Sequence, residues 1–473
     1  MSKAKMPKRG SKSTPTPKKQ GAELGQARAV IADLRRKGFR RAKIGGFDID
    51  GVLRGKYVSL DKLESALGNG FGFCDVIFGW DVADVLYDNA QLTGWHTGYP
   101  DTLAVLDPST ARPIPWEPGV VSMLADFRAG QGEPHPACPR STLKRVLAHA
   151  KKLGFNAKVG AEYEFFLFKE SRDSLLAKGF QNLVPIDPGM FGYSWVRSGQ
   201  DSELMREILD SMEASGIELE GLHTETGPGV YEAALRFDDA LVMADKAALF
   251  KPLLKQIAHR HGLSVSFMAK WNAALPGCSG HLHQSLWKNG QNAFADPRAP
   301  RGMSRVMEHF LAGQIALMTE LTAVVSPTIN SYKRYVPGVW APLVPTWGIE
   351  NRTCSLRVFG AGDAKALRVE HRQPAADMNP YLALAATLGA GLWGIEHELV
   401  LPPEAQGNAG GDEAGRLPRT LREANAALAA SAPARAVLGS EFVDHYVRTR
   451  DWEVRAYEAA VTDWELKRYF EII

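Results

Sequence analysis

The chain contains 473 residues, of which 45% are hydrophobic and 23% charged, and its formal net charge is +3. This length exceeds what one small core fills and predicts two or more domains, with a composition ordinary for a globular protein. The longest apolar run, residues 381–395, is too short to cross a bilayer and predicts a buried core helix instead.

Nothing in the sequence suggests export. The N-terminus lacks the apolar stretch of a signal peptide. The cysteines are scattered and lack the spacing of a metal site; they are Cys74, Cys138, Cys278 and Cys354. We therefore expect a reducing, cytoplasmic setting and no membrane partner.

The net charge conceals an uneven distribution. Residues 1–22 carry seven Lys and Arg side chains and no acidic one, so the rest of the chain has a formal charge of −4. With almost no large apolar side chains, this segment cannot offset its ordering entropy, which predicts a disordered, solubilising tail. The alternative is an arm for nucleic acid or a membrane surface. Because the remainder shows no basic stripe and no nucleic-acid motif, we expect no nucleic-acid partner.

The elements that follow predict two domains of an α+β protein. A helical pattern over residues 21–39 precedes a strand at 42–51 and further short strands, which together predict a small domain over residues 23–125. A Pro-rich junction lies at residues 131–139. The larger domain, residues 126–473, alternates strands with helical patterns over residues 141–154, 240–262 and 303–325.

The stretch GAEYEFFLF places two carboxylates in an otherwise apolar strand. Side chains alternate along a strand, so Glu162 and Glu164 project from one face while Tyr163 and Phe165 project from the other. Two adjacent ionised carboxylates repel each other and are costly to desolvate unless a cation neutralises them. The alternative is a strand at a solvent edge with alternating charges.

Other segments of the sequence favour a bound cation over a strand at a solvent edge. They present acidic, imidazole, hydroxyl or guanidinium groups at alternating or nearby positions: Glu225 and Glu232; His281, His283 and Ser285; Arg368, Glu370 and Arg372. Oxygen-rich clusters with a single imidazole suit Mg²⁺ or Mn²⁺. Arginines suit an anionic substrate, and the combination is typical of phosphoryl transfer. The chain has no Walker-type phosphate-binding motif.

With these residues, the chain resembles the glutamine synthetase family from about residue 23 to its C-terminus. Five blocks in order carry the resemblance: GAEYEFFLF; HTETGPGVYE; GCSGHLHQSLW; NSYKRYVPG with ENRTCSLRV; and RVEHRQPAADMNPYLALAA. It implies a β-grasp N-terminal domain and a catalytic domain whose curved antiparallel sheet lines a bifunnel. ATP would enter as co-substrate from one end and glutamate from the other, with two or three divalent cations between them.

The resemblance also implies a role for each matched residue. Ligands of the metal nearer glutamate would be Glu164, Glu225 and Glu232. Ligands of the metal at the ATP phosphates would be Glu162, His281 and Glu370. Residues holding glutamate would be Gly277, Arg334 and Arg372. Residues clamping the transferred phosphoryl group would be Arg352 and Arg357. Residues on the nucleotide side would be His283, Ser285, Lys365 and Arg368.

The implied reaction activates a carboxylate. Moving the ATP γ-phosphoryl group onto the side-chain carboxylate of glutamate makes an acyl phosphate, whose phosphate leaves readily when an amine attacks. The product is a γ-glutamyl amide, and the site must neutralise the phosphoryl charge and exclude water. The attacking amine must also lose a proton, which requires an acidic group nearby.

The chain departs from its relatives where that proton would go. Members that use ammonia carry a Glu on the loop after SYKR, and Trp340 stands at that position here. An indole face suits a larger organic amine through a cation–π contact, or else Trp340 packs the loop. The second acid of the ammonium side has two candidates, Asp48 and Asp50. Pro276 stands where the bacterial glutamine-forming type commonly has Asn, which removes one polar contact to glutamate. The adenylylated Tyr of the regulated bacterial type is matched near Leu399, so we expect no adenylylation.

Three hypotheses remain. The first is a glutamate–amine ligase of the γ-glutamylpolyamine or γ-glutamylmonoamine kind, in nitrogen metabolism or polyamine breakdown. The second is an ordinary glutamine synthetase using ammonia, and the third is an inactive structural relative, which the complete set of six predicted metal ligands disfavours. The family also implies stacked rings of five or six subunits, such as a dodecamer, with active sites between neighbours.

Overall fold

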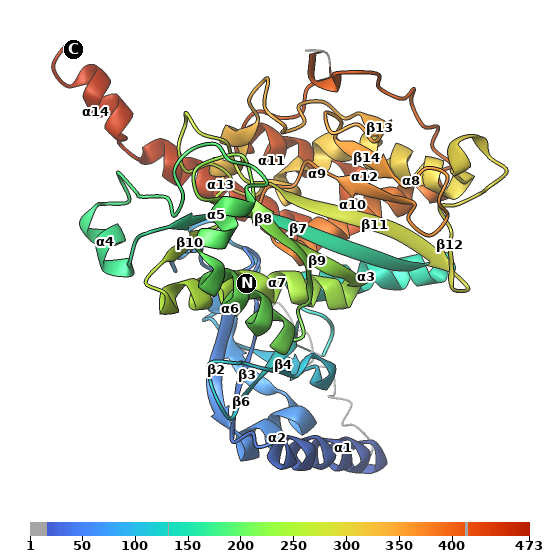
Figure 1. The fold of residues 1–473 in the computed structure, drawn as a ribbon. Coiled ribbons are helices and arrows are strands. Elements are labelled where there is room, and N and C mark those ends of the chain that lie inside the picture. The colour runs from blue at the N-terminus through green and yellow to red at the C-terminus, as the bar shows by residue number, and fades with distance from the viewer. Residues whose placement is uncertain (1–16, 131, 412–414) are drawn as a thin grey trace, which may run out of the picture. The chain divides into compact units, whose positions relative to one another are not determined.

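The strands of the computed structural model form two separate sheets, in a chain that divides into two units (Figure 1). The structure describes residues 17–130, 132–411 and 415–473. The first unit contains Arg54–Asp75, Pro100–His135 and the described residues up to Gly46. The second contains Phe47–Leu53, Val76–Tyr99 and the described part of Pro136–Ile473.

The elements that build the first sheet and its helices are α1 (Pro17–Arg36), β1 (Arg41–Phe47), β2 (Leu53–Ser59), α2 (Leu60–Asn69), β3 (Phe71–Cys74), β4 (Asp101–Leu106), β5 (Arg112–Pro113) and β6 (Val120–Arg128). Within the described residues the strand order is β2-β1-β6-β4-β3, and β5 pairs with β6. β1 and β6 are parallel, whereas β4 is antiparallel to β3 and β6. Gly45 allows β1 and β2 to approach closely, because a Cβ atom there would lie 2.1 Å from the carbonyl oxygen of Arg54.

The strands of the second sheet are β7 (Asn156–Phe168), β8 (Leu219–Thr224), β9 (Val230–Asp239), β10 (Ser264–Ser266), β11 (Gly280–Lys288), β12 (Gln291–Asn292), β13 (Trp347–Ile349), β14 (Leu356–Phe359) and β15 (Arg368–His371). In the described part of the chain their order is β13-β14-β15-β11-β7-β9-β8, with β10 on β7 and β12 on β11. The sheet is mixed rather than antiparallel, because β13 and β14 run parallel. The loop between them turns at Glu350, whose φ of 52° lies in the left-handed region.

The helices of the second unit are α3 (Pro139–Lys152), α4 (Arg172–Ala177), α5 (Trp195–Gln200), α6 (Ser202–Ala214), α7 (Ala240–Arg260), α8 (Arg305–Ala316), α9 (Met318–Val325), α10 (Pro380–Glu396), α11 (Leu421–Ala430), α12 (Ala432–Leu438), α13 (Ser440–Ala459) and α14 (Asp463–Tyr469). α10 is buried along almost its whole length and packs against α3, α7, α8, α9 and α12. This confirms the predicted core helix. The single helix expected over residues 303–325 is wrong: it breaks at Leu317, where the backbone leaves the helical region (φ −102°, ψ 7°).

β7 has one apolar face and one acidic face, as its alternation predicts. On the apolar face, the Tyr163 ring stacks on Phe250 of α7 at 5.9 Å between centroids, and Phe165 stacks on Tyr231 of β9 at 6.2 Å. All four rings are fully buried. This aromatic layer is a rigid base for the carboxylates on the opposite face.

Two expectations concern the basic N-terminal tail and the absence of a membrane-spanning helix. The first sixteen residues of the predicted basic tail lie outside the described residues, and α1 begins at Pro17. Within the described ranges, every helix is too short or too polar to cross a membrane.

Candidate active site

One face of the second sheet gathers side chains from six strands, β14, β15, β11, β7, β9 and β8, arranged in three rows that run across the strands. Arg357 on β14 lies opposite Glu370 on β15, which lies opposite His283 on β11. Two residues along β11, His281 lies opposite Glu162 on β7. Alternation along β11 places both imidazoles on the same face. Segments far apart in sequence therefore meet in two adjacent rows.

A third row continues this face toward the far edge of the sheet. Glu164 on β7 lies opposite Glu232 on β9, and Glu232 lies opposite His223 on β8. Glu225 follows the end of β8, two residues after His223, so it returns to the same face. The predicted acidic residues are thus brought together, and His223 joins them without having been predicted.

The first two rows form one polar cluster. His281 Nδ1 lies 3.4 Å from Glu162 Oε2 and 3.4 Å from Glu370 Oε1, and His283 Nε2 lies 3.0 Å from Glu162 Oε1. Burial disfavours the charge on Glu162, but hydrogen bonds from His281 and His283 outweigh it and hold the pKa of Glu162 well below its ordinary value. For Glu370, too, the favourable charges of His281 and Arg372 exceed the effect of burial and lower the pKa.

Glu164 has a different environment. Its side chain is half-buried, and its Oε2 accepts a hydrogen bond of 2.6 Å from the backbone N–H of Ser279. Burial raises the pKa of Glu164, and the charge of Glu232 raises it further, whereas the bond from Ser279 opposes both. A carboxylate in this position gains a cation partner if a metal binds at the third row.

Three sets of side chains offer ligand atoms within 4.8 Å of one another: Glu162, His283 and Glu370; Glu162, Glu232 and His281; and His223, Glu225 and Glu232. Neighbouring sets share Glu162 or Glu232, so the three sets form a continuous line. The predicted ligands fall into these sets except Glu164, and the sets divide them differently from the two predicted triads. Which residue binds which metal stays a prediction.

These residues fit divalent cations. Glu370 Oε2 is buried and accepts no hydrogen bond from any described residue, although Arg357 Nη1 lies 3.5 Å away. Carboxylate oxygens with one imidazole per set match the ligand preferences of Mg²⁺ and Mn²⁺. A bound cation would also relieve the repulsion among carboxylates that otherwise share one buried face.

Arginines surround this line. Arg372 Nη1 donates to Glu370 Oε1 at 2.5 Å, and Arg357 Nη2 donates to Glu350 Oε2 at 2.5 Å. Arg334 is buried and donates to the carbonyl oxygens of Gln373 (2.9 Å) and Arg372 (3.2 Å). These bonds hold three of the predicted arginines in place within the second unit.

Gly277 and Arg352 occupy two further predicted positions. A Cβ atom at Gly277 would lie 2.4 Å from the Ala269 carbonyl oxygen and 2.9 Å from Arg334 Cβ, so the backbone approaches Arg334 as closely as only glycine permits. Arg352 is exposed. Burial raises the pKa of Tyr193, the charges of Glu225 and Glu232 raise it further, and the charge of Arg352 opposes these effects.

The four predicted nucleotide-side residues line one cavity of about 860 Å³: His283, Ser285, Lys365 and Arg368. Glu162 also lines this cavity, which therefore reaches the metal-ligand line. Arg368 Nε donates to His283 Nδ1 at 3.2 Å, so a cationic group and an imidazole meet where the cavity adjoins the carboxylates. A cavity of this size accommodates a nucleotide-sized ligand.

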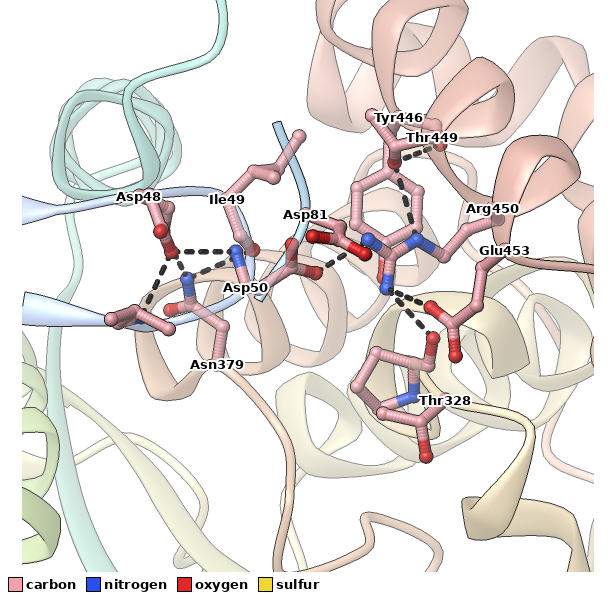
Figure 2. Close-up of polar contacts among 12 residues, drawn as sticks. Asp48, Ile49, Asp50, Asp81, Thr328, Asn379, Tyr446, Thr449, Arg450 and Glu453 are labelled. Atoms are coloured by element: carbon pink, nitrogen blue, oxygen red, sulfur yellow. Dashed lines mark hydrogen bonds and ion pairs between the residues drawn. The ribbon is translucent and has the colours of Figure 1, made fainter. Parts of the chain in front are cut away.

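Asp48 and Asp50 lie in the turn between β1 and β2 (Figure 2). Asp48 Oδ1 accepts hydrogen bonds from the backbone N–H groups of Asp50 (3.1 Å) and Val52 (2.8 Å), so this carboxylate stabilises the turn itself. Asp50 Oδ1 accepts from Arg450 Nη2 of α13 at 2.5 Å. Asn379, which caps α10, donates to the carbonyl oxygens of Asp48 (3.1 Å) and Ile49 (3.2 Å).

Trp340 lies in the loop after Arg334, and 69% of its surface is exposed. Its neighbours Val336 and Val339 are exposed as well, at 39% and 43%. Within one chain the indole therefore does not pack into the core, and the loop presents it to solvent.

Sequence reasoning missed three residues of this region. The alternation of His223 with Glu225 in LHTETG was a usable signal for His223. Tyr193 has no local signal, since only the fold places its ring 4.6 Å from that of His223. Arg450 lies in an ordinary amphipathic helix, and its partnership with Asp50 is equally invisible in the sequence.

Comparisons with known proteins identify relatives that cover most of the chain. The family model for the glutamine synthetase catalytic domain matches residues 136–469. The type-1 glutamine synthetase 2 of Dictyostelium discoideum is 50% identical over 440 residues, covering 91% of this chain and 84% of that protein. The glutamate–isopropylamine ligase of a Pseudomonas species is 40% identical over 436 residues, covering 91% and 95%. A solved GmaS/ADP complex matches with a TM-score of 0.82 at 31% identity, covering 93% and 99%.

Proposed function

The chain belongs to the glutamine synthetase family and is an ATP-dependent glutamate–ammonia or glutamate–amine ligase, and from this premise we propose that its acceptor is an organic amine. The observation that carries the proposal is Trp340. It stands where ammonia-using members have a glutamate, and it is 69% exposed on its loop. An indole cannot accept a proton from ammonium, but its face attracts an alkylammonium group and its surface favours attached carbon atoms.

A relative supports the same acceptor class. The Pseudomonas protein that is 40% identical to this chain is a glutamate–isopropylamine ligase by name. The alternative is ammonia, favoured by the Dictyostelium relative, which is 50% identical and named a glutamine synthetase. The inactive relative is the third possibility, and the complete line of candidate metal ligands disfavours it.

In this proposal, the six predicted ligands hold Mg²⁺ or Mn²⁺: Glu162, Glu164, Glu225, Glu232, His281 and Glu370. Such cations neutralise phosphoryl charge. His283, Ser285, Lys365 and Arg368 contact the nucleotide in the cavity that they line. Gly277, Arg334 and Arg372 bind glutamate, whose carboxylate groups match forked guanidinium donors. Arg352 and Arg357 bind the transferred phosphoryl group.

The chemistry then proceeds in two steps. An oxygen of the glutamate side-chain carboxylate attacks the γ-phosphorus of ATP, ADP leaves, and Arg357 stabilises the charge on the transferring group. The amine nitrogen attacks the acyl carbon of the resulting acyl phosphate, phosphate leaves, and a γ-glutamyl amide remains. The arginines orient both anions, and the buried face limits access of water to the acyl phosphate.

The amine must transfer its proton to a carboxylate. Asp48 and Asp50 are the proposed acceptors, and the turn geometry favours Asp50. Asp48 Oδ1 accepts two backbone N–H groups of its own turn. Asp50 Oδ1 is held by Arg450 at 2.5 Å, but the second oxygen of Asp50 accepts only a longer bond, 3.3 Å, from the Tyr87 hydroxyl, and this second oxygen is the proposed proton acceptor. Asp50→Asn is therefore expected to reduce kcat more than Asp48→Asn at equal stability.

The proposal includes the family's architecture and assembly. The first sheet corresponds to a β-grasp domain, the second lines a bifunnel, and the domains span residues 23–125 and 126–473 after a basic tail. Subunits form stacked rings in which one subunit completes the site of the next. Sedimentation analysis tests this: a species of ten or twelve subunits is expected, and a monomer that turns over substrate contradicts it.

An acceptor panel tests the function. Phosphate release is measured with glutamate, ATP and either ammonia, ethanolamine, isopropylamine or putrescine, and acceptors are ranked by kcat/KM. We expect the highest value for an organic amine. Preference for ammonia over every amine contradicts the proposal and supports the alternative. Absence of turnover, together with absence of Mn²⁺ and ATP binding, identifies an inactive relative.

A further inference from the structure

The third row of the site contains an imidazole that the predicted ligand set does not include. His223 Nε2 lies 3.4 Å from Glu232 Oε1, and His223 Nδ1 lies 3.9 Å from Glu225 Oε1. One ligand atom from each of these residues falls within 4.8 Å of the others. The register of β8 and β9 places His223 directly opposite Glu232.

The contact at Nδ1 of His223 leaves Nε2, the nitrogen that faces Glu232, available to a cation. Nδ1 lies 3.2 Å from the carbonyl oxygen of Thr224, a group that only accepts. In a neutral imidazole, an N–H at Nδ1 satisfies this contact and leaves the lone pair of Nε2 for a cation. Metal-binding histidines in proteins are oriented in the same way, by donating the other ring N–H to a carbonyl or carboxylate oxygen.

The segment next to His223 holds the ring in this orientation. The Tyr193 ring stacks on the imidazole at 4.6 Å between centroids and 30° between planes. Its backbone N–H donates to the Thr224 carbonyl oxygen at 2.7 Å, and the N–H of Ser194 donates to Thr224 Oγ1 at 2.8 Å. Tyr193 adopts a φ of 55°, which is costly for a bulky side chain and shows that these contacts determine its place.

We propose that His223 Nε2 binds a divalent cation together with Glu225 and Glu232, at the β8 end of the line of ligands. The inference rests on the proposed function in one respect: Glu225 and Glu232 are also the ligands that the proposed function assigns to the metal on the glutamate side. It changes the chemistry of that end, because an imidazole favours Co²⁺ and Zn²⁺, and to a smaller extent Mn²⁺, over Mg²⁺ more than a third carboxylate does. Glu164, held by Ser279, then supports this cation from the adjacent strand.

Metal binding to the full-length protein without substrates tests the inference. Free Mn²⁺ is followed by electron paramagnetic resonance during a titration, and pulsed measurements detect the ¹⁴N nuclei bound to Mn²⁺. His223→Ala is expected to weaken one class of Mn²⁺ site at least 10-fold, to reduce the ¹⁴N signal at full loading and to lower the Mn²⁺ over Mg²⁺ preference of that class. Unchanged Mn²⁺ affinity and ¹⁴N signal overturn the inference.

A matched control and a second variant separate the explanations. His261 is as exposed as His223 (28% against 30%) and pairs with Glu207 at 2.7 Å, far from the predicted ligands in sequence, so His261→Ala should leave Mn²⁺ binding unchanged. If Glu225→Ala loses the Mn²⁺ class but His223→Ala does not, the carboxylate site of the proposed function stands and the His223 ligand is refuted. If Glu162→Ala and Glu225→Ala both bind Mn²⁺ normally, the metal site of the proposed function itself fails.

Discussion

Arg450→Met removes the guanidinium group that joins three segments of the second unit. Arg450 is 1% exposed. Besides the bond to Asp50, its Nη1 donates to the Pro327 carbonyl oxygen at 2.8 Å and lies 3.5 Å from Glu453 Oε2 (Figure 2). The methionine fills similar volume but removes this donor from the Asp50 and Glu453 carboxylates and from the Pro327 carbonyl oxygen.

The expected loss follows from the geometry of this ion pair. The side chains of Arg450 and Asp50 are 2% and 8% exposed, so solvent does not replace the lost partner. Removing one member of a buried, hydrogen-bonded pair costs about 3–5 kcal/mol of unfolding free energy. With an unfolding entropy of about 2.1 cal/mol/K per residue, a chain of 473 residues loses about 3–5 °C in Tm.

Differential scanning calorimetry at pH 7 measures this change. Arg455→Met is the control, because Arg455 lies on the same helix and pairs with Asp88 at 2.6 Å while 43% of its side chain is exposed. Solvent screens an exposed pair, so this variant should melt close to the wild type. Arg450→Met combined with Asp50→Asn should cost less than the two single changes together, since they share one interaction. A Tm for Arg450→Met within 1 °C of the wild type refutes the reasoning.

Three further predictions concern the metals, the acceptor and acid stability. Glu162→Ala and Glu164→Ala should each abolish phosphate release and each remove a different class of Mn²⁺ site in a titration; near-normal turnover of either contradicts the assignment. Trp340→Glu should raise kcat/KM for ammonia relative to the best organic amine, whereas Val339→Glu, with the same charge one residue away, should not; equal ratios in both would mean that Trp340 only packs. Burial lowers the pKa of His445 to about 4, so below pH 6.5 the unfolded chain binds a proton that the native state excludes. The free energy of unfolding of the wild type, measured with urea, should therefore fall by about 2 kcal/mol between pH 6.5 and pH 5, and His445→Phe should lose less. An equal fall in both proteins would count against this role of His445.

Local patterns were sufficient for the elements that carry the site. The alternation in GAEYEFFLF predicts the face shared by Glu162 and Glu164, and the structure places Tyr163 and Phe165 in an aromatic layer on the other face. The apolar run at residues 381–395 predicts the buried helix α10. These features depend on the strand and helix periods, which are properties of neighbouring residues.

Sequence patterns were insufficient to predict features that depend on contacts between distant segments. Residues 303–325 read as one helix, although the chain breaks at Leu317, because packing of each half against other helices overrides local propensity. The parallel pairing of β13 with β14 depends on the loop that turns at Glu350. Neither feature has a periodic signal.

The sequence by itself determined the kinds of group in the site and which of them share a strand face. Carboxylates, imidazoles and arginines in alternation, together with the family resemblance, were enough to predict phosphoryl-transfer chemistry. Only the tertiary structure decided which groups meet across strands, because register fixes neighbours that the sequence separates. It set His223 opposite Glu232. It also joined Asp50 to Arg450, a contact that exists only when α13 packs beside the turn between β1 and β2.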